Sequence, residues 1–221
     1  MFAFPVSSRI LRRSMPSPFM IDDFGDRIAS VWSELRPATR GLVERALQAA
    51  ATGTQTGRNF QYDARADLEL SRFLTALDAT LQDRSAGKTE ALDPKKGGNI
   101  KSVADTLASV LQEQTESAEV FAQLVRRAEM QKDYKRIDAL ADALTSRFPP
   151  SEICELARSE DVIVRELANE ALARCPVSVL IALLNDPIDA ETARYALRRQ
   201  VAEYGSEEAR RILAALDQEE M

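Results

Sequence analysis

Two stretches decide the fold of this chain: Leu156-Ala-Arg-Ser-Glu-Asp-Val-Ile-Val-Arg-Glu-Leu-Ala-Asn-Glu-Ala-Leu172 and Leu183-Leu-Asn-Asp-Pro-Ile-Asp-Ala-Glu-Thr-Ala-Arg-Tyr-Ala-Leu197. Each contains a short apolar helix, an acidic turn and a second helix that ends in Ala-Leu. Helices this short are marginal alone in water, so neighbours must cover their apolar stripes. The repetition predicts helical hairpins stacked side by side over residues 150–205, an architecture that provides binding surface rather than chemistry.

The composition predicts an all-α protein. The 221 residues are 45% hydrophobic but only 6% aromatic, and they are dominated by Ala, Leu, Glu and Arg, a mixture that favours helices over strands. No apolar run approaches the roughly 18 residues that a membrane-spanning helix needs, so we expect a soluble, cytoplasmic protein without a membrane partner. The net charge of -6 counts against a nucleic acid partner, because neutralised phosphates supply most of that affinity.

The chain contains no histidine and two cysteines. The absence of histidine removes Ser-His-Asp and Cys-His catalysis, histidine-ligated zinc and a histidine pH switch. Cys154 and Cys175 fall on the repeat helices, where we interpret them as reduced, buried side chains, with a disulfide as the alternative. Their number and spacing do not suit a metal site. We therefore predict no catalytic residue, no metal site and no cofactor.

Changes of pattern along the chain predict four parts. Residues 1–20 carry three arginines and no acid, which indicates a disordered lead, with an overlong gene start or an organelle-targeting segment as alternatives. Residues 21–83 are expected to form an N-terminal helical segment that matches no family pattern. Residues 84–99 combine Pro, paired Gly and charges, which predicts a flexible linker. A domain of repeated helical hairpins is expected over residues 100–221.

Apolar residues at helical spacing open the N-terminal segment: Ile28, Val31, Trp32 and Leu35. We expect Trp32 to be a core residue on this stripe, with a binding anchor as the alternative. A further helix is predicted over about residues 63–83, with an apolar stripe on one face. Charged residues occupy the opposite face, and we interpret them as solvated residues without a catalytic pair: Asp67, Glu69, Arg72 and Asp78.

One local basic cluster stands out from the acidic background: Arg126, Arg127, Lys132, Lys135 and Arg136. Its functional interpretation is a surface for an anionic partner such as phosphate, an acidic peptide or nucleic acid. The alternative is favourable charge at a helix C-terminus, with salt bridges to acids close by in the sequence. Ser117 and Asp133 are predicted helix N-caps, because their side-chain oxygens accept from the unpaired amides of a first turn.

The range 159–172 resembles the HEAT-like repeat family, whose units run Leu-x-x-Leu, Asp-x-Asp and Val-Arg, followed by an Ala-rich helix that ends in Ala-Leu. The corresponding residues here are Ile153, Leu156, Glu160, Asp161, Val164, Arg165, Ala168, Ala171 and Leu172. The next unit keeps the turn and the ending, but its loop is two residues shorter and lacks the arginine. The resemblance covers about residues 150–204, with a degenerate unit at 134–148. It implies that the domain at residues 100–221 is a HEAT-like helical repeat domain, folded as a short α-solenoid.

The repeat residues have predicted structural roles. Asp161 and Asp189 are expected to be N-caps, where a negative oxygen meets a helix N-terminus. The resemblance implies that Arg165 reaches an acid in an adjoining unit and thereby ties the stack together. The open ends of a helical stack make self-association possible.

Three hypotheses for function follow. The first is a non-catalytic module for protein–protein interaction or scaffolding, favoured by the repeat and by the lack of a catalytic constellation. The second is a binder of an anionic ligand or nucleic acid through the basic cluster at residues 126–136. The third, which the resemblance implies, is a lyase or glycosylase on the same scaffold, drawing on Asp161, Glu191, Arg194 and Tyr195. A specific site is predicted where the stack meets the preceding helices, near residues 126–136.

Overall fold

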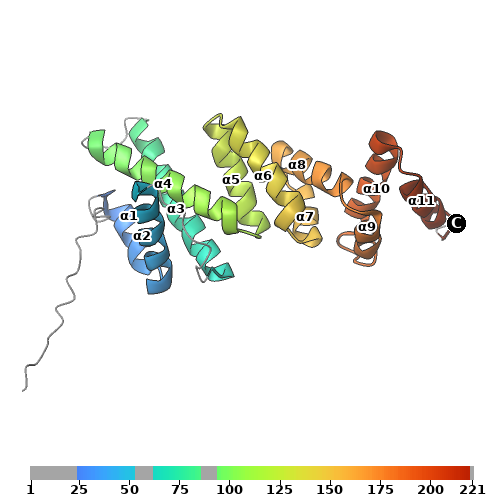
Figure 1. The fold of residues 1–221 in the computed structure, drawn as a ribbon, viewed down its shortest axis with the longest axis horizontal. Helices are drawn as coiled ribbons and strands as arrows, with labels where there is room; N and C mark the ends of the chain where they lie inside the picture. Colours follow the sequence, from blue (N-terminus) through green and yellow to red (C-terminus); the bar gives the residue numbers. More distant parts are fainter. Residues whose placement is uncertain (1–23, 53–61, 86–93, 220–221) are drawn as a thin grey trace, which may run out of the picture.

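A computed structural model describes residues 24–52, 62–85 and 94–219, which form an elongated row of α-helices (Figure 1). These described residues contain eleven helices and no strand, which confirms the all-α prediction. None of the described helices is both long enough and apolar enough to cross a lipid bilayer. The predicted lead at residues 1–20 lies outside the described residues.

Four helices form the first part of the row: α1 (Asp26–Glu34), α2 (Pro37–Thr52), α3 (Ala64–Ser85) and α4 (Pro94–Gln114). α3 packs against α1 and α4, and α2 packs against α4 and α3. The apolar stripe of α1 buries Ile28 and places Trp32 against the core, half-buried, with its ring centroid 5.4 Å from that of Phe73. Trp32 is therefore a packing residue, as predicted.

Seven further helices continue the row: α5 (Ala118–Met130), α6 (Tyr134–Arg147), α7 (Pro150–Ala157), α8 (Val162–Ala173), α9 (Val177–Leu183), α10 (Ala190–Tyr204) and α11 (Glu207–Glu219). Two predicted N-caps are confirmed, because the side chain of Ser117 accepts from the amide of Val120 and that of Asp133 from the amide of Arg136. α10 ends at Gly205, whose φ of 64° lies in the left-handed region that glycine adopts most easily.

The helices from α5 to α10 pack as three successive pairs. Within the pairs, α5 contacts α6, α7 contacts α8, and α9 contacts α10. Between the pairs, α5 contacts α7, α6 contacts α8, α7 contacts α9, and α8 contacts α10. Each helix thus packs on its own partner and on the corresponding helix of the next pair, and α11 packs on α10 at the end of the row (Figure 1).

One hydrophobic core runs through the described residues, from Phe24 to Ala209. The core continues across the predicted linker at 84–99, because α3 and α4 pack against each other. The linker prediction is wrong at its two ends, since residues 84 and 85 belong to α3 and residues 94–99 begin α4. Pro94 occupies the first helical position, which proline favours, and packing of the buried residues that follow outweighs the helix cost of the paired glycines.

The prediction of a solvated charged face on α3 is also wrong for three of its four residues. Asp67 is buried, and Glu69 and Asp78 are half-buried, whereas Arg72 is exposed. The reason is that α3 has helices on several sides, with α1, α2, α4 and α5 all in contact with it. A helix in the middle of a bundle has little surface left for solvent, so its acids require partners in the protein.

Candidate functional site

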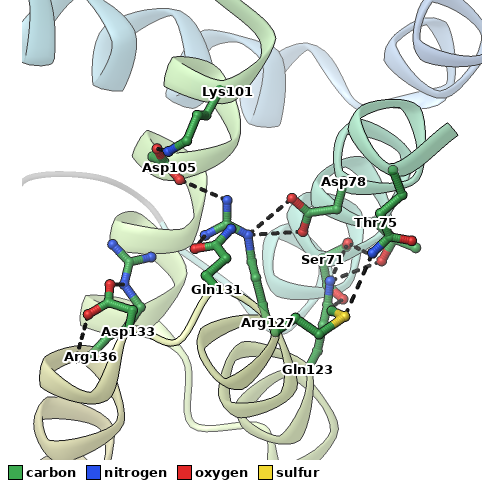
Figure 2. A network of polar contacts seen from close by, with 12 residues as sticks. Ser71, Thr75, Asp78, Lys101, Asp105, Gln123, Arg127, Gln131, Asp133 and Arg136 are labelled. Carbon is green, nitrogen blue, oxygen red and sulfur yellow. Dashed lines mark hydrogen bonds and ion pairs between the residues drawn. The ribbon is translucent and has the colours of Figure 1, made fainter. Parts of the chain in front are cut away.

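Arg127, at the centre of the predicted basic cluster, is buried rather than exposed. Only 2% of its surface is accessible. Its Nε donates to both carboxylate oxygens of Asp78, at 2.9 and 3.1 Å, and its Nη2 donates to Oδ1 of Asp105 at 2.8 Å (Figure 2). Nη1 donates to Oε1 of Gln131 at 3.3 Å. One guanidinium therefore joins α3, α4 and α5.

The two carboxylates that face Arg127 differ in their electrostatics. Burial raises the pKa of Asp78, even against the charge and hydrogen bonds of Arg127. Burial also opposes ionisation of Asp105, but hydrogen bonds from Lys101 and Arg127 outweigh it and leave the pKa of Asp105 lowered. Because Arg127 is buried and already pairs with two carboxylates, it cannot bind a phosphate of a partner. Its prediction as part of a surface patch is therefore wrong.

The remaining basic residues of the cluster separate onto different surfaces. Nε of Arg126 lies 3.2 Å from Oδ2 of Asp161, which reaches it from the start of α8. Arg136 pairs with Asp133 at 3.6 Å on its own helix, and it lines a cavity of about 330 Å³ together with Lys135. Lys132 is exposed in the turn between α5 and α6, with a positive φ of 55°. Burial of Arg127 and the pairing of Arg126 with α8 thus remove both of these arginines from a common patch with Lys135 and Arg136.

The prediction for Asp161 is confirmed. Its Oδ1 accepts from the amides of Ile163 and Val164 at 3.0 and 3.2 Å, which caps α8, while Oδ2 pairs with Arg126. The predicted partner of Arg165, an acid in an adjoining unit, is wrong. Nη1 of Arg165 donates to the carbonyl oxygens of Ser159 and Glu160, so this arginine closes its own loop and does not reach an acid of an adjoining unit.

Asp189 stands at the N-cap position of α10, but its side chain makes no capping hydrogen bond. Its carboxylate is buried and accepts instead from Nη1 of Arg158 at 2.7 Å. Arg158 is the C-cap residue of α7, so the ion pair joins the second pair of helices to the third. Arg158, and not Arg165, therefore forms the ion pair that connects neighbouring units.

A regular spacing appears once the helix starts are known. Asp133, Asp161 and Asp189 are the N-cap residues of α6, α8 and α10, and they follow one another at intervals of 28 residues. The same interval relates the buried residues Leu140 and Ala168. An alignment of the sequence with itself at an offset of 28 residues would have revealed this repeat. The repeat also relates the α5–α6 pair to the two later pairs, whereas the two stretches quoted at the start cover only the later pairs.

The turns within the three pairs carry exposed apolar side chains beside these aspartates. Tyr134 is 67% exposed, Val162 60% and Ile188 71%. We call these three residues the cap edge. Arg126 of α5 pairs with Asp161 at the start of α8, and Arg158 after α7 pairs with Asp189 at the start of α10. Both ion pairs reach from the C-terminal part of the first helix in one pair to the N-cap residue of the second helix in the next pair, so the three turns lie along one side of the row.

A second buried polar group involves Asp67, one of the acids expected to be solvated. Its Oδ2 accepts from Oγ1 of Thr115 at 2.7 Å and its Oδ1 accepts from the hydroxyl of Tyr62. Burial raises the pKa of Asp67, although both hydrogen bonds act in the opposite direction, and burial followed by the hydrogen bond to Asp67 raises that of Tyr62. These contacts tie the start of α3 to the connection between α4 and α5.

The residues considered for enzyme chemistry are engaged in separate contacts. Asp161 caps α8 and pairs with Arg126, whereas Glu191 is exposed and pairs with Arg198 at 3.5 Å. Tyr195 is exposed. The described residues contain no group of three or more Cys, Asp or Glu side chains that could hold a metal ion.

Both cysteines are free thiols. Cys154 is fully buried and Cys175 half-buried, and burial raises the pKa of Cys154 to about 12. A thiol with so high a pKa is protonated at neutral pH and is a poor nucleophile.

No family model, no curated protein and no solved structure matches this chain.

Proposed function

We propose that this protein is a non-catalytic module for protein–protein interaction, built as a short HEAT-like α-solenoid. The support for the solenoid is the packing of α5 to α10, in which each helix contacts its own partner and the corresponding helix of the next pair. The interval of 28 residues between helix caps is shorter than the roughly 40 to 47 residues of full-length HEAT units. The shorter interval in this chain is consistent with the short first helices of two pairs, α7 with 8 residues and α9 with 7 residues.

The observation that carries the proposed function is the cap edge. Tyr134, Val162 and Ile188 expose well over half of their surfaces at neighbouring positions of three successive turns. Singly exposed apolar residues are ordinary, but a row of them along one side of a repeat array forms an apolar surface that a partner can cover. The packing of corresponding helices in successive pairs, together with the ion pair between Arg158 and buried Asp189, holds the turns in place, so the row is presented as a preformed surface.

The test compares two double variants of the tagged full-length protein in affinity purification from cells that express it naturally, with quantitative mass spectrometry. Val162→Ser with Ile188→Ser removes apolar surface from the cap edge. Leu68→Ser with Tyr195→Ser removes comparable exposed apolar surface elsewhere on the molecule and serves as the matched control. We expect recovery of a protein partner to fall by about tenfold or more with the first variant and to stay near the wild-type level with the second.

Two results would contradict the proposal. One is that no protein is enriched by the wild type over a tag-only control. The other is that both double variants lose the partner equally, since that would show general damage to the fold or a contact away from the cap edge. Circular dichroism spectra and urea unfolding of both variants establish beforehand that they are folded.

A further inference from the structure

A groove lies where the repeat pairs meet the first helices, with α3 as its floor and α1 and α5 as its walls. Its volume is about 480 Å³, which is within the range of sites that hold a small ligand or a few side chains of a peptide. We call it the arginine groove, and the described residues that line it are Arg27, Val31, Ser71, Arg72, Thr75, Ala76, Ala79, Glu119, Gln123 and Arg126.

The rim of the groove is basic. Arg27 comes from α1, Arg72 from α3 and Arg126 from α5, and Glu119 offsets one of these charges, which leaves an excess of two positive charges among the described lining residues. The protein as a whole carries a net charge of -6. The lining of the groove is thus basic on an acidic molecule, and Asp83 and Asp161, which pair with two of the arginines, lie outside the lining.

The three arginines are available to a ligand. Arg72 is exposed and pairs with no acid within the described part of the chain. The side chains of Arg27 and Arg126 are 63% and 55% exposed, and each makes one ion pair, with Asp83 at 3.4 Å and Asp161 at 3.2 Å. Exposed ion pairs of this kind contribute about 1 kcal/mol or less, so either arginine can exchange its acid for a carboxylate of a ligand at small cost.

The floor of the groove is fixed by hydrogen bonds between α3 and α5. Nε2 of Gln123 donates to the carbonyl oxygen of Ser71 at 3.2 Å and to Oγ1 of Thr75 at 2.9 Å, while the hydroxyl of Ser71 donates to Oε1 of Gln123 (Figure 2). Val31, Ala76 and Ala79 add apolar surface without filling the space. A polar, ordered floor with small side chains and a basic rim suits a segment that brings both carboxylates and small apolar groups.

We infer that the arginine groove binds an acidic segment of a partner protein, with carboxylates held by Arg27, Arg72 and Arg126 and small apolar side chains laid on the floor. Guanidinium groups bind carboxylates through paired, charge-assisted hydrogen bonds. A long polyanion such as nucleic acid fits less well, because the negative charge of the rest of the molecule repels it beyond the groove. The groove and the cap edge involve different residues, so either can fail without the other.

The experiment measures fluorescence anisotropy of a labelled eight-residue peptide in which glutamate alternates with alanine and leucine, titrated with the full-length protein at low salt. The variant Arg27→Gln/Arg72→Gln/Arg126→Gln removes the basic rim. The control Arg65→Gln/Arg198→Gln/Arg211→Gln removes three exposed arginines elsewhere and changes the net charge equally. We expect the peptide to bind the wild type and the control alike, and the rim variant to bind about tenfold or more weakly.

Three outcomes overturn the inference. The first is that the peptide does not bind the wild type, and the second is that the rim and control variants weaken binding equally, which indicates attraction by net charge alone. The third is that single-stranded DNA of the same charge binds more tightly than the peptide and is lost with the rim variant, which assigns the groove to nucleic acid. The rim variant also removes the ion pair between Arg126 and Asp161 beside the cap edge. The cap edge is therefore tested only with Val162→Ser/Ile188→Ser, in which all three rim arginines are unchanged, so the two proposals can fail separately.

Discussion

Arg127 keeps its charge in a place where only 2% of its surface meets water. It is stabilised because Asp78 and Asp105 satisfy it from two different helices. We expect Arg127→Met to lower the free energy of unfolding by about 3 kcal/mol, since it leaves the largely buried carboxylate of Asp78 without its cation, whereas Asp105 keeps Lys101. Urea unfolding monitored by circular dichroism measures the change.

The matched control for that prediction is Arg126→Met, the neighbouring residue with an exposed ion pair to Asp161. Its loss should change the free energy of unfolding by less than about 1 kcal/mol. If the two variants are equally stable, Arg127 does not hold the three helices together as the geometry indicates.

Asp67 provides a prediction about pH. Burial raises its pKa above the ordinary value of 3.8, so between that value and the raised pKa the folded state binds more protons than the unfolded state. The free energy of unfolding of the wild type, relative to Asp67→Asn, should therefore fall as the pH rises from 4 to 7. Urea unfolding of both proteins at the two pH values measures this difference.

Asp63 serves as the control with a shift of opposite sign. The hydrogen bond from Arg36 lowers its pKa from 3.8 to about 2, so its contribution to stability is fully present above about pH 5 and is lost progressively as the pH falls below that. The free energy of unfolding of the wild type, relative to Asp63→Asn, should therefore not fall between pH 4 and 7 but rise slightly, and it should be constant above about pH 5. A difference for Asp67→Asn that is constant, or that grows with pH, would contradict the prediction.

At the scale of the helix, the caps of α8 and α10 differ in chemistry although the same residue type occupies both. Asp161 caps α8 through Oδ1, as an asparagine oxygen also can, and its ion pair with Arg126 is exposed. Asp189 makes no capping hydrogen bond, and its buried carboxylate holds Arg158 through its charge. We expect Asp161→Ala to cost about 1 kcal/mol and Asp161→Asn much less. Asp189→Asn should cost more than Asp161→Asn, because it leaves the ion pair of a buried carboxylate unmade. Equal costs for the two asparagine variants in chemical unfolding would refute this assignment.

The left-handed residue after α10 yields a second prediction at this scale. An added Cβ at Gly205 meets nothing within 4 Å, so only its φ of 64° penalises a side chain. Gly205→Ala should lower the free energy of unfolding by about 1 kcal/mol. The same substitution at Gly41, inside α2 and with ordinary contact to Arg45 at 3.6 Å, should raise it by up to about 1 kcal/mol. Changes of the same sign in the two variants would argue against a conformational cause.

The helices could be predicted from the sequence more completely than their contacts. Stripes such as the one through Ile28 and Leu35 appear at spacings of three and four residues, so local information suffices. The partners of Arg127 could not be found in this way, because Asp78 lies 49 residues earlier in the chain and Asp105 lies 22 residues earlier. Charged residues close in sequence look like a surface cluster until the helices that cover them are placed.

At the scale of the whole molecule, the core thins toward the C-terminal end. α9 buries only Val177 and Leu180, and within the described part of α11 only Ala209 is buried, whereas α5 buries residues along most of its length. In a row of helices that rely on their neighbours, the end with less buried apolar surface opens at lower free energy. Amides of α9 to α11 should therefore exchange with solvent deuterium faster than those of α3 to α5. Uniform protection along the row, measured by mass spectrometry, would contradict this expectation.

The constant interval of 28 residues between Asp133, Asp161 and Asp189 has a consequence for how such a protein can change in evolution or by design. A segment of that length that starts and ends between helices can be duplicated in frame, and each copy arrives with its own cap and its own tie to the next. The row of helices would then lengthen by one pair at each duplication, while the helices at its two ends keep the packing partners that they have now. A spacing maintained over three pairs allows the length of the row, and with it the proposed cap edge, to vary without a change in the individual pairs.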